Sequence, residues 1–323
     1  MVNSEDTTRE LFDQLLEPDA KHFARLREDA KNAGKGVKTG FKLHSKKADG
    51  SVSEIDLWIP KYAVTMMAAR TGGGKTTWMT NLAMRMALGG SKGFFITLEE
   101  PAFAIRAKMM ATHSRTVGKP ITSWDATGAI AGRNPCQTME QFDKEVMRNL
   151  RIVDANQTVD FDKCESATVM YQPQWISNLI AYRNSMAGQA LDFVVIDFGQ
   201  LMETMDSDNS NSYQRMKGVM QAVKNIAGGL GIAVIIGAQL KRECAGIPFW
   251  DWEPEMIRDG SDMEQAASLI LAVGSDKEYP DKECTMALRY LKNRNGPKNV
   301  AGMFKTEFEC NYIPLDGQEP IFD

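Results

Sequence analysis

One loop constrains the fold of this 323-residue chain more than any other feature: it reads Ala69-Arg70-Thr71-Gly72-Gly73-Gly74-Lys75-Thr76-Thr77. It follows a short apolar run at Tyr62–Ala69 and precedes an amphipathic segment at Thr76–Leu88. The apolar run is typical of a buried strand, and the spacing of apolar residues in the second segment predicts a helix. A strand, a glycine loop and a helix in this order predict a unit whose loop wraps around an anion at the helix N-terminus.

The residue types in this loop suit the binding of a nucleoside triphosphate. Glycines let successive backbone N–H groups turn inward around phosphate oxygens, and the helix N-terminus adds partial positive charge. We expect Lys75 to reach the β- and γ-phosphates and the Thr76 hydroxyl to bind Mg²⁺. The first glycine of the usual GxxxxGK[ST] pattern is Ala69 here, and a glycine-rich turn that precedes a lysine by chance is the alternative. The predicted nucleotide-binding residues are Arg70, Gly72, Gly73, Gly74, Lys75, Thr76 and Thr77.

Strands alternate with helices over most of the chain. Helices are expected near 102–115 and 137–149, with a loop broken by glycine and proline between them. This alternation predicts an α/β fold, with a mainly parallel central sheet flanked by helices. Residues 5–33 predict two short helices, so we expect a helical N-terminal segment (1–35) followed by one large domain (36–323). Further buried strands are expected at Gly93–Leu98, Arg151–Asp154, Phe193–Asp197, Ala233–Ala238, Leu269–Val273 and Met286–Leu291.

Two carboxylates follow buried strands of this predicted sheet. Asp197 ends the strand Phe193–Asp197 and is expected in the Mg²⁺–water shell, but it has no adjacent glutamate that could activate a nucleophile. Glu99 ends the strand directly after the helix of the glycine loop. Parallel strands deliver the residues at their carboxyl ends to the same crevice, so Glu99 is expected to act as a general base, the layout of a RecA-like P-loop NTPase. A solvated carboxylate at a helix start is the alternative for Glu99 and the preferred interpretation of Glu100.

Composition excludes several other classes. The formal net charge is −4, which argues against a polybasic coat for nucleic acid but not against a local basic channel. Five widely spaced cysteines without a CxxC pair, and three histidines, argue against a structural zinc site and a disulfide framework. We recognise neither a signal peptide nor a membrane-spanning run, so a cytoplasmic protein is expected.

From Gly36 to about Pro297, the chain resembles the C-terminal motor domain of the DnaB-type replicative helicases. The alanine at position 69 is itself part of that family's phosphate loop. Glycine and serine at 260 and 261 stand in the reverse of the usual order, and about 35 residues precede the first motif, where the family has a large N-terminal domain. The resemblance is carried, in chain order, by Gly36-Val37-Lys38-Thr39-Gly40-Phe41, Ala68-Ala69-Arg70 with Gly74-Lys75-Thr76, Thr97-Leu98-Glu99-Glu100-Pro101, Ile196-Asp197-Phe198-Gly199-Gln200-Leu201-Met202, Ala238-Gln239-Leu240-Lys241-Arg242, Arg258-Asp259-Gly260-Ser261 with Glu264-Gln265, and Lys292-Asn293-Arg294-Asn295-Gly296-Pro297.

The resemblance implies a ring-forming, ATP-hydrolysing DNA helicase, expected to be hexameric and to move 5′–3′ on single-stranded DNA. ATP would lie between subunits, with Arg294 and Lys292 of a neighbouring chain neutralising charge at the γ-phosphoryl group. An exposed basic turn is the alternative for these two residues. Gln239 closes a strand near the γ-phosphate and is expected to sense its loss. The implied catalytic residues are Glu99, Lys75, Arg294, Lys292 and Gln239, and the implied Mg²⁺ ligands are Thr76 and Asp197.

The segment after Gln239 is the expected DNA interface. Its basic side chains and backbone N–H groups would contact successive phosphates of a strand in a central channel. The aromatic residues of the same loop are compatible with base stacking, with a packed loop or with a subunit contact. The predicted DNA-binding residues are Arg258, Asp259, Gly260, Lys241 and Arg242, and the aromatic ones are Phe249, Trp250 and Trp252.

The expected partners are single-stranded or forked DNA, further copies of the chain, and a primase or helicase loader, in a compact phage- or plasmid-type version found in a bacterial cell or a phage-infected host. The N-terminal helices would dock on a neighbouring subunit or fold back on their own domain. Two other functions stay open: a RecA-like recombinase that forms filaments as a DNA-dependent ATPase, and a nucleotide-switched replication accessory or loader that is not a motor.

Overall fold

The structure, a computed structural model, describes residues 19–34, 36–133, 137–155, 172–202, 212–258, 260–275, 285–307 and 311–314. Contacts divide the chain into two compact units, Met1–Gly34 and Lys35–Asp323. In the first unit, α2 (Asp19–Ala33) ends just before Gly34, whose φ of 47° suits a helix stop. It is the second of the two predicted N-terminal helices, and the first lies outside the described residues.

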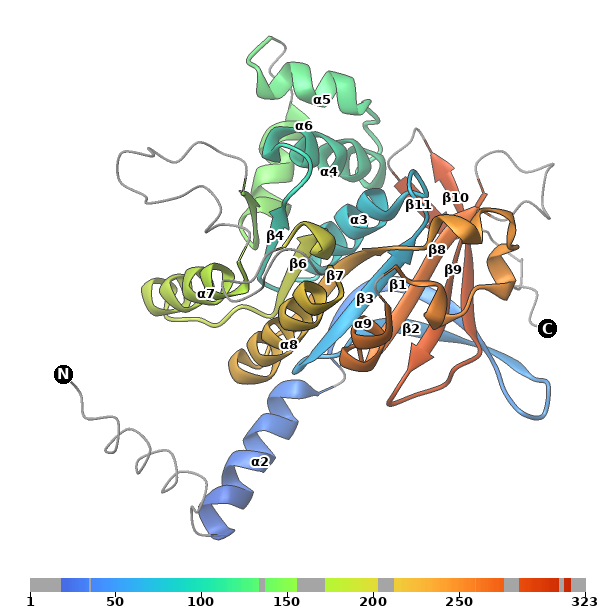
Figure 1. Cartoon of the computed structure of the whole chain (residues 1–323). Coiled ribbons are helices and arrows are strands. Elements are labelled where there is room, and N and C mark those ends of the chain that lie inside the picture. Colours follow the sequence, from blue (N-terminus) through green and yellow to red (C-terminus); the bar gives the residue numbers. More distant parts are fainter. Residues whose placement is uncertain are drawn as a thin grey trace. The chain divides into compact units, whose positions relative to one another are not determined.

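One mixed sheet forms the centre of the second unit (Figure 1). Its order is β2-β1-β10-β9-β8-β3-β7-β6-β4-β5, with β11 beside β10. Neighbouring strands from β8 to β5 run parallel, as the alternation of strands and helices predicts, whereas those from β8 to β2 are antiparallel. The strands are β1 (Val37–Lys46), β2 (Val52–Ile59), β3 (Ala63–Ala69), β4 (Gly93–Thr97), β5 (Leu150–Asp154), β6 (Phe193–Asp197), β7 (Ala233–Gln239), β8 (Leu269–Ser275), β9 (Thr285–Asn293), β10 (Val300–Glu307) and β11 (Asn311–Pro314).

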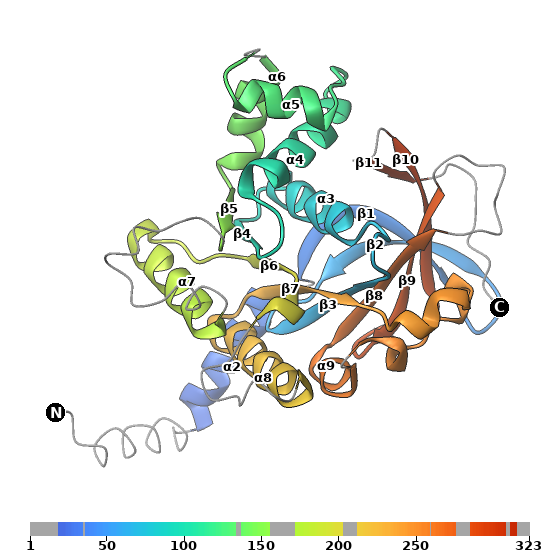
Figure 2. The ribbon, with the colours of Figure 1, turned by 45° about the horizontal axis from the view of Figure 1, so that its top comes forward.

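Helices cover both faces of this sheet, and Figure 2 shows α3 on one face and α8 and α9 on the other. Alternate residues of β3 serve the two cores: Met67 and Ala69 pack with α3 and α4, and Met66 and Ala68 pack with α7 and α8. A strand buried on both sides reads as a continuous apolar run, as β3 does. The helices of this unit are α3 (Lys75–Leu88), α4 (Ala102–Thr116), α5 (Ser123–Ile130), α6 (Gln137–Phe142), α7 (Pro173–Ala187), α8 (Ser212–Leu230) and α9 (Gly260–Ala266), with short 3-10 turns at Gly199–Leu201, Arg242–Gly246, Phe249–Asp251 and Pro254–Met256.

The segment between β4 and β5 differs from the expectation. Its middle part, predicted as a loop, contains α5, which begins with a capping box: Thr122 Oγ1 accepts from the Asp125 N–H, and the Asp125 carboxylate accepts from the Thr122 N–H. The predicted helix 137–149 is a short α6 followed by a π-helical turn at Asp143–Met147. The glycines and prolines around α5 predict a loop, but the capping box at Thr122 stabilises a short helix there.

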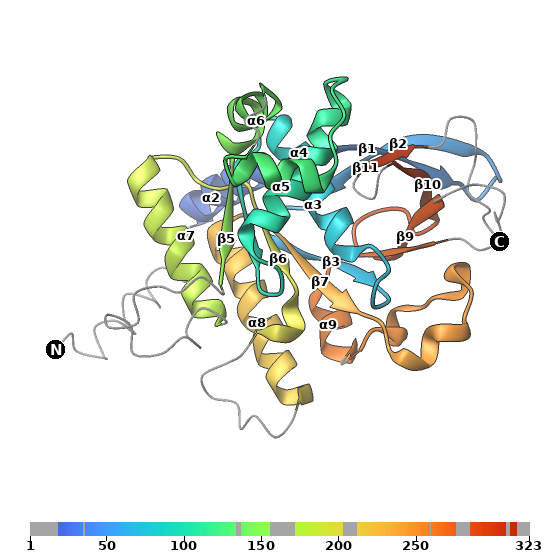
Figure 3. The same ribbon diagram turned by 90° about the horizontal axis from the view of Figure 1, so that it is seen from above.

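The register of the parallel strands brings the carboxyl ends of four strands to one edge of the sheet. Ala69, the last residue of β3, pairs with Gln239, the last residue of β7. Thr97 at the end of β4 likewise pairs with Asp197 at the end of β6. The segments that follow these strands therefore share one edge, seen from above in Figure 3.

Candidate active site

The glycine loop joins β3 to α3 at this edge. Gly72 and Gly74 have φ values of 73° and 80°, which residues with a side chain rarely adopt. The Gly73 N–H donates to the Arg70 carbonyl over 2.8 Å, and a Cβ at Gly73 would lie 2.9 Å from that oxygen. Because α3 begins at Lys75 without a side-chain cap, its first N–H groups are left to an anion. This geometry suits phosphate.

Lys75 reaches from the first turn of α3 to the end of β6. Its Nζ lies 3.3 Å from Oδ1 of Asp197, and the two side chains are only 8% and 1% exposed. The ammonium also lies 3.8 Å from the centroid of the Phe198 ring, a cation–π contact that the sequence did not reveal. Burial lowers the pKa of Lys75, while the negative charges of Asp197 and Glu99 act in the opposite direction.

A nucleotide with Mg²⁺ fits the chemistry of these residues. Lys75 Nζ and Asp197 Oδ1 are buried, and neither has a well-directed hydrogen bond among the described residues. A buried ion pair is stabilised only when further polar partners surround it, and phosphate oxygens and water on Mg²⁺ would be such partners. Thr76 and Thr77 are half-buried in the same first turn. Lys75 would hold phosphate, and Thr76 with Asp197 would hold Mg²⁺; no cluster of three or more His, Cys, Asp or Glu side chains in the described part of the chain could hold a metal alone.

Glu99 lies in the turn between β4 and α4, and this turn is tied down on both sides. The Leu98 N–H donates to the Asp197 carbonyl over 2.8 Å. The Thr97 hydroxyl donates to the Glu100 carbonyl over 2.5 Å and accepts from the Glu100 N–H over 3.2 Å. The Glu99 side chain is exposed and, within the residues described, has no hydrogen bond or ion pair of its own. The structure therefore brings an unpaired Glu99 carboxylate to the edge occupied by Lys75.

Glu100 differs from its interpretation as a solvated carboxylate. Its two carboxylate oxygens each lie 2.6 Å from Nζ of Lys108, one to two turns into α4. Both side chains are about two-thirds buried, with 31% and 28% of their surfaces exposed. The sequence offers only a weak signal for this pair, because the glutamate precedes the helix and the lysine lies eight residues along the chain.

Gln239 and three cations line a hollow beside the glycine loop. The Arg258 N–H donates to the Gln239 carbonyl over 2.9 Å, so the long segment after β7 returns to the end of the same strand (orange in Figure 3). Asp259 lies outside the described residues, and Gly260 is the first residue of α9. The hollow has a volume of about 380 Å³ and is lined by Thr71, Gln239, Leu240, Lys241, Arg242, Glu243 and Arg258.

The aromatic residues of that segment form a packed loop. Phe249 and Trp252 are only 5% and 3% exposed, and a Cβ at Gly274 would collide with both rings. The Arg289 guanidinium donates to the carbonyls of Trp250 and Trp252. Of the three interpretations left open, the structure favours packing over base stacking for the two buried rings. The signal for this lies in β8 and β9, far away in sequence.

Lys292 and Arg294 lie at the other edge of the sheet. The end of β9 pairs with the start of β8, whereas the glycine loop follows the end of β3, which runs parallel to β8. The Lys292 ammonium donates to the Glu264 carbonyl over 2.6 Å, and Arg294 Nη2 donates to the Gln265 carbonyl over 2.9 Å, both in the last turn of α9. The length of the strands therefore separates both cations from the glycine loop of their own chain.

A comparison with protein families matches residues 36–312 to the DnaB-like helicase C-terminal domain. The chain belongs to this family. A probable replicative DNA helicase from Trieres chinensis is 30% identical to this DnaB-like chain over 128 residues. That match covers 38% of the chain and only 28% of the relative, so the two share less than a third of the relative's length.

Solved structures show the same fold as this DnaB-like domain. The ATPase domain of G40P superposes with a TM-score of 0.67 at 18% identity, covering 93% of this chain and 99% of that one. A DnaB-like replicative helicase, whose structure was described with its interactions with primase, gives a TM-score of 0.66 at 17% identity over 97% of this chain and 72% of that one. The predicted RecA-like α/β fold is thereby confirmed.

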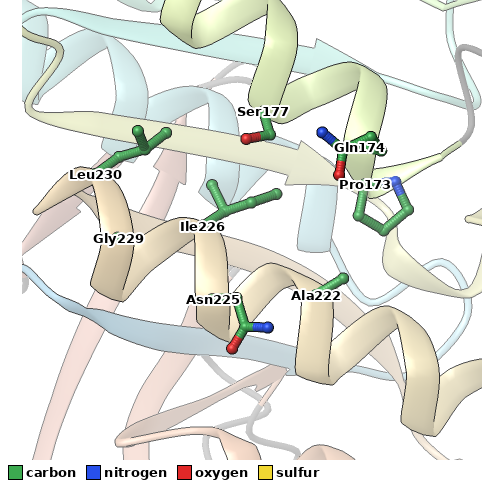
Figure 4. A pocket seen from close by; sticks show the side chains of 8 residues that line it. All are labelled: Pro173, Gln174, Ser177, Ala222, Asn225, Ile226, Gly229 and Leu230. Carbon is green, nitrogen blue, oxygen red and sulfur yellow. The ribbon is translucent and has the colours of Figure 1, made fainter. Parts of the chain in front are cut away.

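A second hollow of this DnaB-like domain lies between α7 and α8 (Figure 4). Its volume is about 280 Å³, and Gln174 and Ser177 of α7 face Ile226 of α8 across it. The described residues that line it include no charged side chain, so it does not suit phosphate. None of the described helices is long and apolar enough to cross a membrane.

Proposed function

We propose that this chain is an ATP-driven, ring-forming DNA helicase that translocates 5′–3′ on single-stranded DNA and unwinds duplex DNA. The observation that carries the proposal is one edge of a RecA-like sheet where Lys75, Asp197, Glu99 and Gln239 meet beside a hollow lined by cations. Family membership and the helicases among its relatives support the same function.

The chemical step assigned to this edge is hydrolysis of ATP. Glu99 accepts a proton from a water molecule as the water oxygen attacks the γ-phosphorus, and the bond to the β–γ bridging oxygen breaks to release ADP and phosphate. Lys75 and the N–H groups of the glycine loop neutralise the phosphate oxygens. Mg²⁺, held by Thr76 and Asp197, supplies further neutralisation of charge when bound.

The same reaction needs cations from a neighbouring copy of the chain. Lys292 and Arg294 lie at the opposite edge of the sheet from the loop that binds phosphate. A second subunit that presents its β9 end to this loop would bring both cations to the γ-phosphate, where such an arginine contributes on the order of 10³–10⁵ in rate in other NTPases. The complete site would then consist of two chains, in a ring that we expect to be hexameric.

Single-stranded DNA is the proposed ligand of the segment after β7. Lys241, Arg242 and Arg258 are exposed, and three cations in one hollow suit the phosphates of a strand. The Leu240 N–H donates to Ala69 at the end of β3 over 3.0 Å, and the Arg258 N–H donates to Gln239. Movement at the γ-phosphate would therefore pass through Gln239 to the residues that hold DNA. A primase or a loader remains a proposed partner, because a structural neighbour was described with primase.

The test is unwinding of a forked DNA duplex by the full chain with ATP and Mg²⁺. We expect the wild type to separate the strands and the variants Lys75→Ala and Glu99→Gln to fail. Glu99→Gln should lower hydrolysis by about 10²–10⁴-fold while retaining nucleotide binding, because it removes the base and not the phosphate site. Lys75→Ala should lose binding as well.

Glu145→Gln is the matched control, because it removes a carboxylate at the π-helical turn that precedes the start of β5, whereas Glu99 follows the end of β4. It should unwind DNA at the wild-type rate. Retained unwinding by Glu99→Gln would contradict the assignment of the base. DNA-stimulated hydrolysis without unwinding, together with helical filaments in electron micrographs, would contradict the helicase and favour a recombinase.

A further inference from the structure

Two adjacent glutamates, Glu99 and Glu100, follow β4, and their side chains have different surroundings. Glu99 is exposed and close enough to Lys75 for its charge to act on that ammonium. Glu100 is turned toward α4, where Lys108 contacts both of its carboxylate oxygens at 2.6 Å. The backbone of Glu100 is fixed as well, by the two hydrogen bonds with the Thr97 hydroxyl.

A second free carboxylate at this edge would work against the site. ATP carries several negative charges, and an uncompensated carboxylate close to them would repel them and weaken ATP binding. A mobile Glu100 could also compete with Glu99 for the attacking water. Pairing with a lysine removes both effects at once, because it neutralises the charge and fixes the side chain.

We propose that Lys108 is a positioning residue: its ion pair with Glu100 holds this carboxylate away from the phosphate loop, so that Glu99 alone of the two glutamates serves as the base. This inference rests on the proposed function, since it assumes that the turn after β4 faces ATP. It assigns roles to Glu100 and Lys108 that do not follow from the family motif, which carries one glutamate in this turn.

The test compares Lys108→Met with the double variant Glu100→Gln/Lys108→Met in the full chain. Both lose the same lysine from α4, so they share any structural damage, but only the single variant leaves a free carboxylate. For Lys108→Met we expect the KM for ATP, and the Kd for a fluorescent ATP analogue, to rise roughly three- to tenfold in about 50 mM salt. The rise should shrink in about 500 mM salt, where exposed charges are screened.

The double variant should bind and hydrolyse ATP within about twofold of wild type. Lys108→Arg should keep the wild-type Kd and KM for ATP, because a guanidinium can also contact both carboxylate oxygens. A double variant as impaired as Lys108→Met would overturn the inference, because packing of the lysine would then explain the loss. So would a Lys108→Met protein identical to wild type, or a Glu100→Gln protein as inactive as Glu99→Gln. The binding measurement keeps this test separate from the proposed function: a wild type that binds ATP without hydrolysing it contradicts the function alone.

Discussion

At the scale of the residue, the buried ammonium of Lys75 should make nucleotide binding sensitive to alkaline pH. Burial lowers the pKa of Lys75 from its usual 10.5, and phosphate binds the protonated form. Affinity is therefore full below the lowered pKa and falls as the pH rises through it, earlier than an ordinary lysine would allow. We expect the Kd of a fluorescent ATP analogue to rise over a pH range that lies below the usual lysine value of 10.5. A flat Kd over this range, with an unchanged circular dichroism spectrum, would contradict the expectation.

The residues that could be found from the sequence share one property: each directly follows a buried strand. Asp197 ends β6, Glu99 lies in the turn after β4, and the glycine loop follows β3, so the rule that parallel strands end at one edge places them together. The pair of Glu100 and Lys108 could not be found in this way. It depends on how a turn and a helix are oriented, and the same residues in solvent would give the same pattern.

At the scale of the element, Arg289 of β9 holds the segment after β7 in place. Its guanidinium donates to the carbonyls of Trp250 and Trp252, eight and six residues before Arg258. Hydrogen bonds from a charged donor contribute about 1.5–3 kcal/mol, so Arg289→Gln should loosen this loop. We expect several-fold weaker binding of a labelled single-stranded oligonucleotide, measured by fluorescence anisotropy, with unchanged binding of mononucleotide. The matched control is Arg151→Gln on β5, which should bind both ligands as the wild type does. Equal binding of the oligonucleotide by Arg289→Gln and wild type would show that the hydrogen bonds from Arg289 do not contribute to DNA binding.

The helical segment between β4 and β5 should carry a small sensitivity to acid. A hydrogen bond from Gln141, and then one with His113, holds the pKa of Glu145 below its usual 4.5. The stability that this carboxylate contributes is present above its usual pKa and is lost as the pH falls through the lowered value. Because the side chain is 42% exposed, the contribution is small. Glu145→Gln should lower the Tm by about 1–3 °C at pH 7 and by less at an acidic pH below 4.5. An equal loss at both pH values would assign the effect to packing.

The strand β1 was not predicted from the sequence, and its burial pattern shows why. In β1 the buried and exposed residues alternate, with Lys38 and Lys42 facing outward, which is a readable strand signal. Its buried positions, however, include Thr39 and Ser45, and a glycine at 40 interrupts the run. Polar residues inside and a glycine in the middle weaken the pattern, so β1 was not predicted from the sequence, whereas β9 of the same antiparallel part was expected at Met286–Leu291.

At the scale of the whole molecule, a site shared between chains can be tested by mixing two inactive variants. Lys75→Ala lacks the phosphate lysine, and Arg294→Ala lacks the cation that the neighbour would supply. Some interfaces in a mixed assembly combine an intact Lys75 with an intact Arg294, so the mixture should hydrolyse ATP although each variant alone does not. The measurement is the steady-state rate of phosphate release at several mixing ratios. A mixture no more active than the sum of its parts would place the whole site in one chain.

The placement of Lys292 and Arg294 at the edge opposite the glycine loop also bears on how copies of the chain would assemble and how many complete sites an assembly would have. Because these cations and the glycine loop lie at opposite edges of the sheet, we expect a head-to-tail contact in which each copy gives at one edge and receives at the other. A closed circle of such copies has as many complete sites as chains, whereas an open row always has one fewer. Dilution below the assembly concentration should therefore abolish turnover per chain while leaving every chain folded.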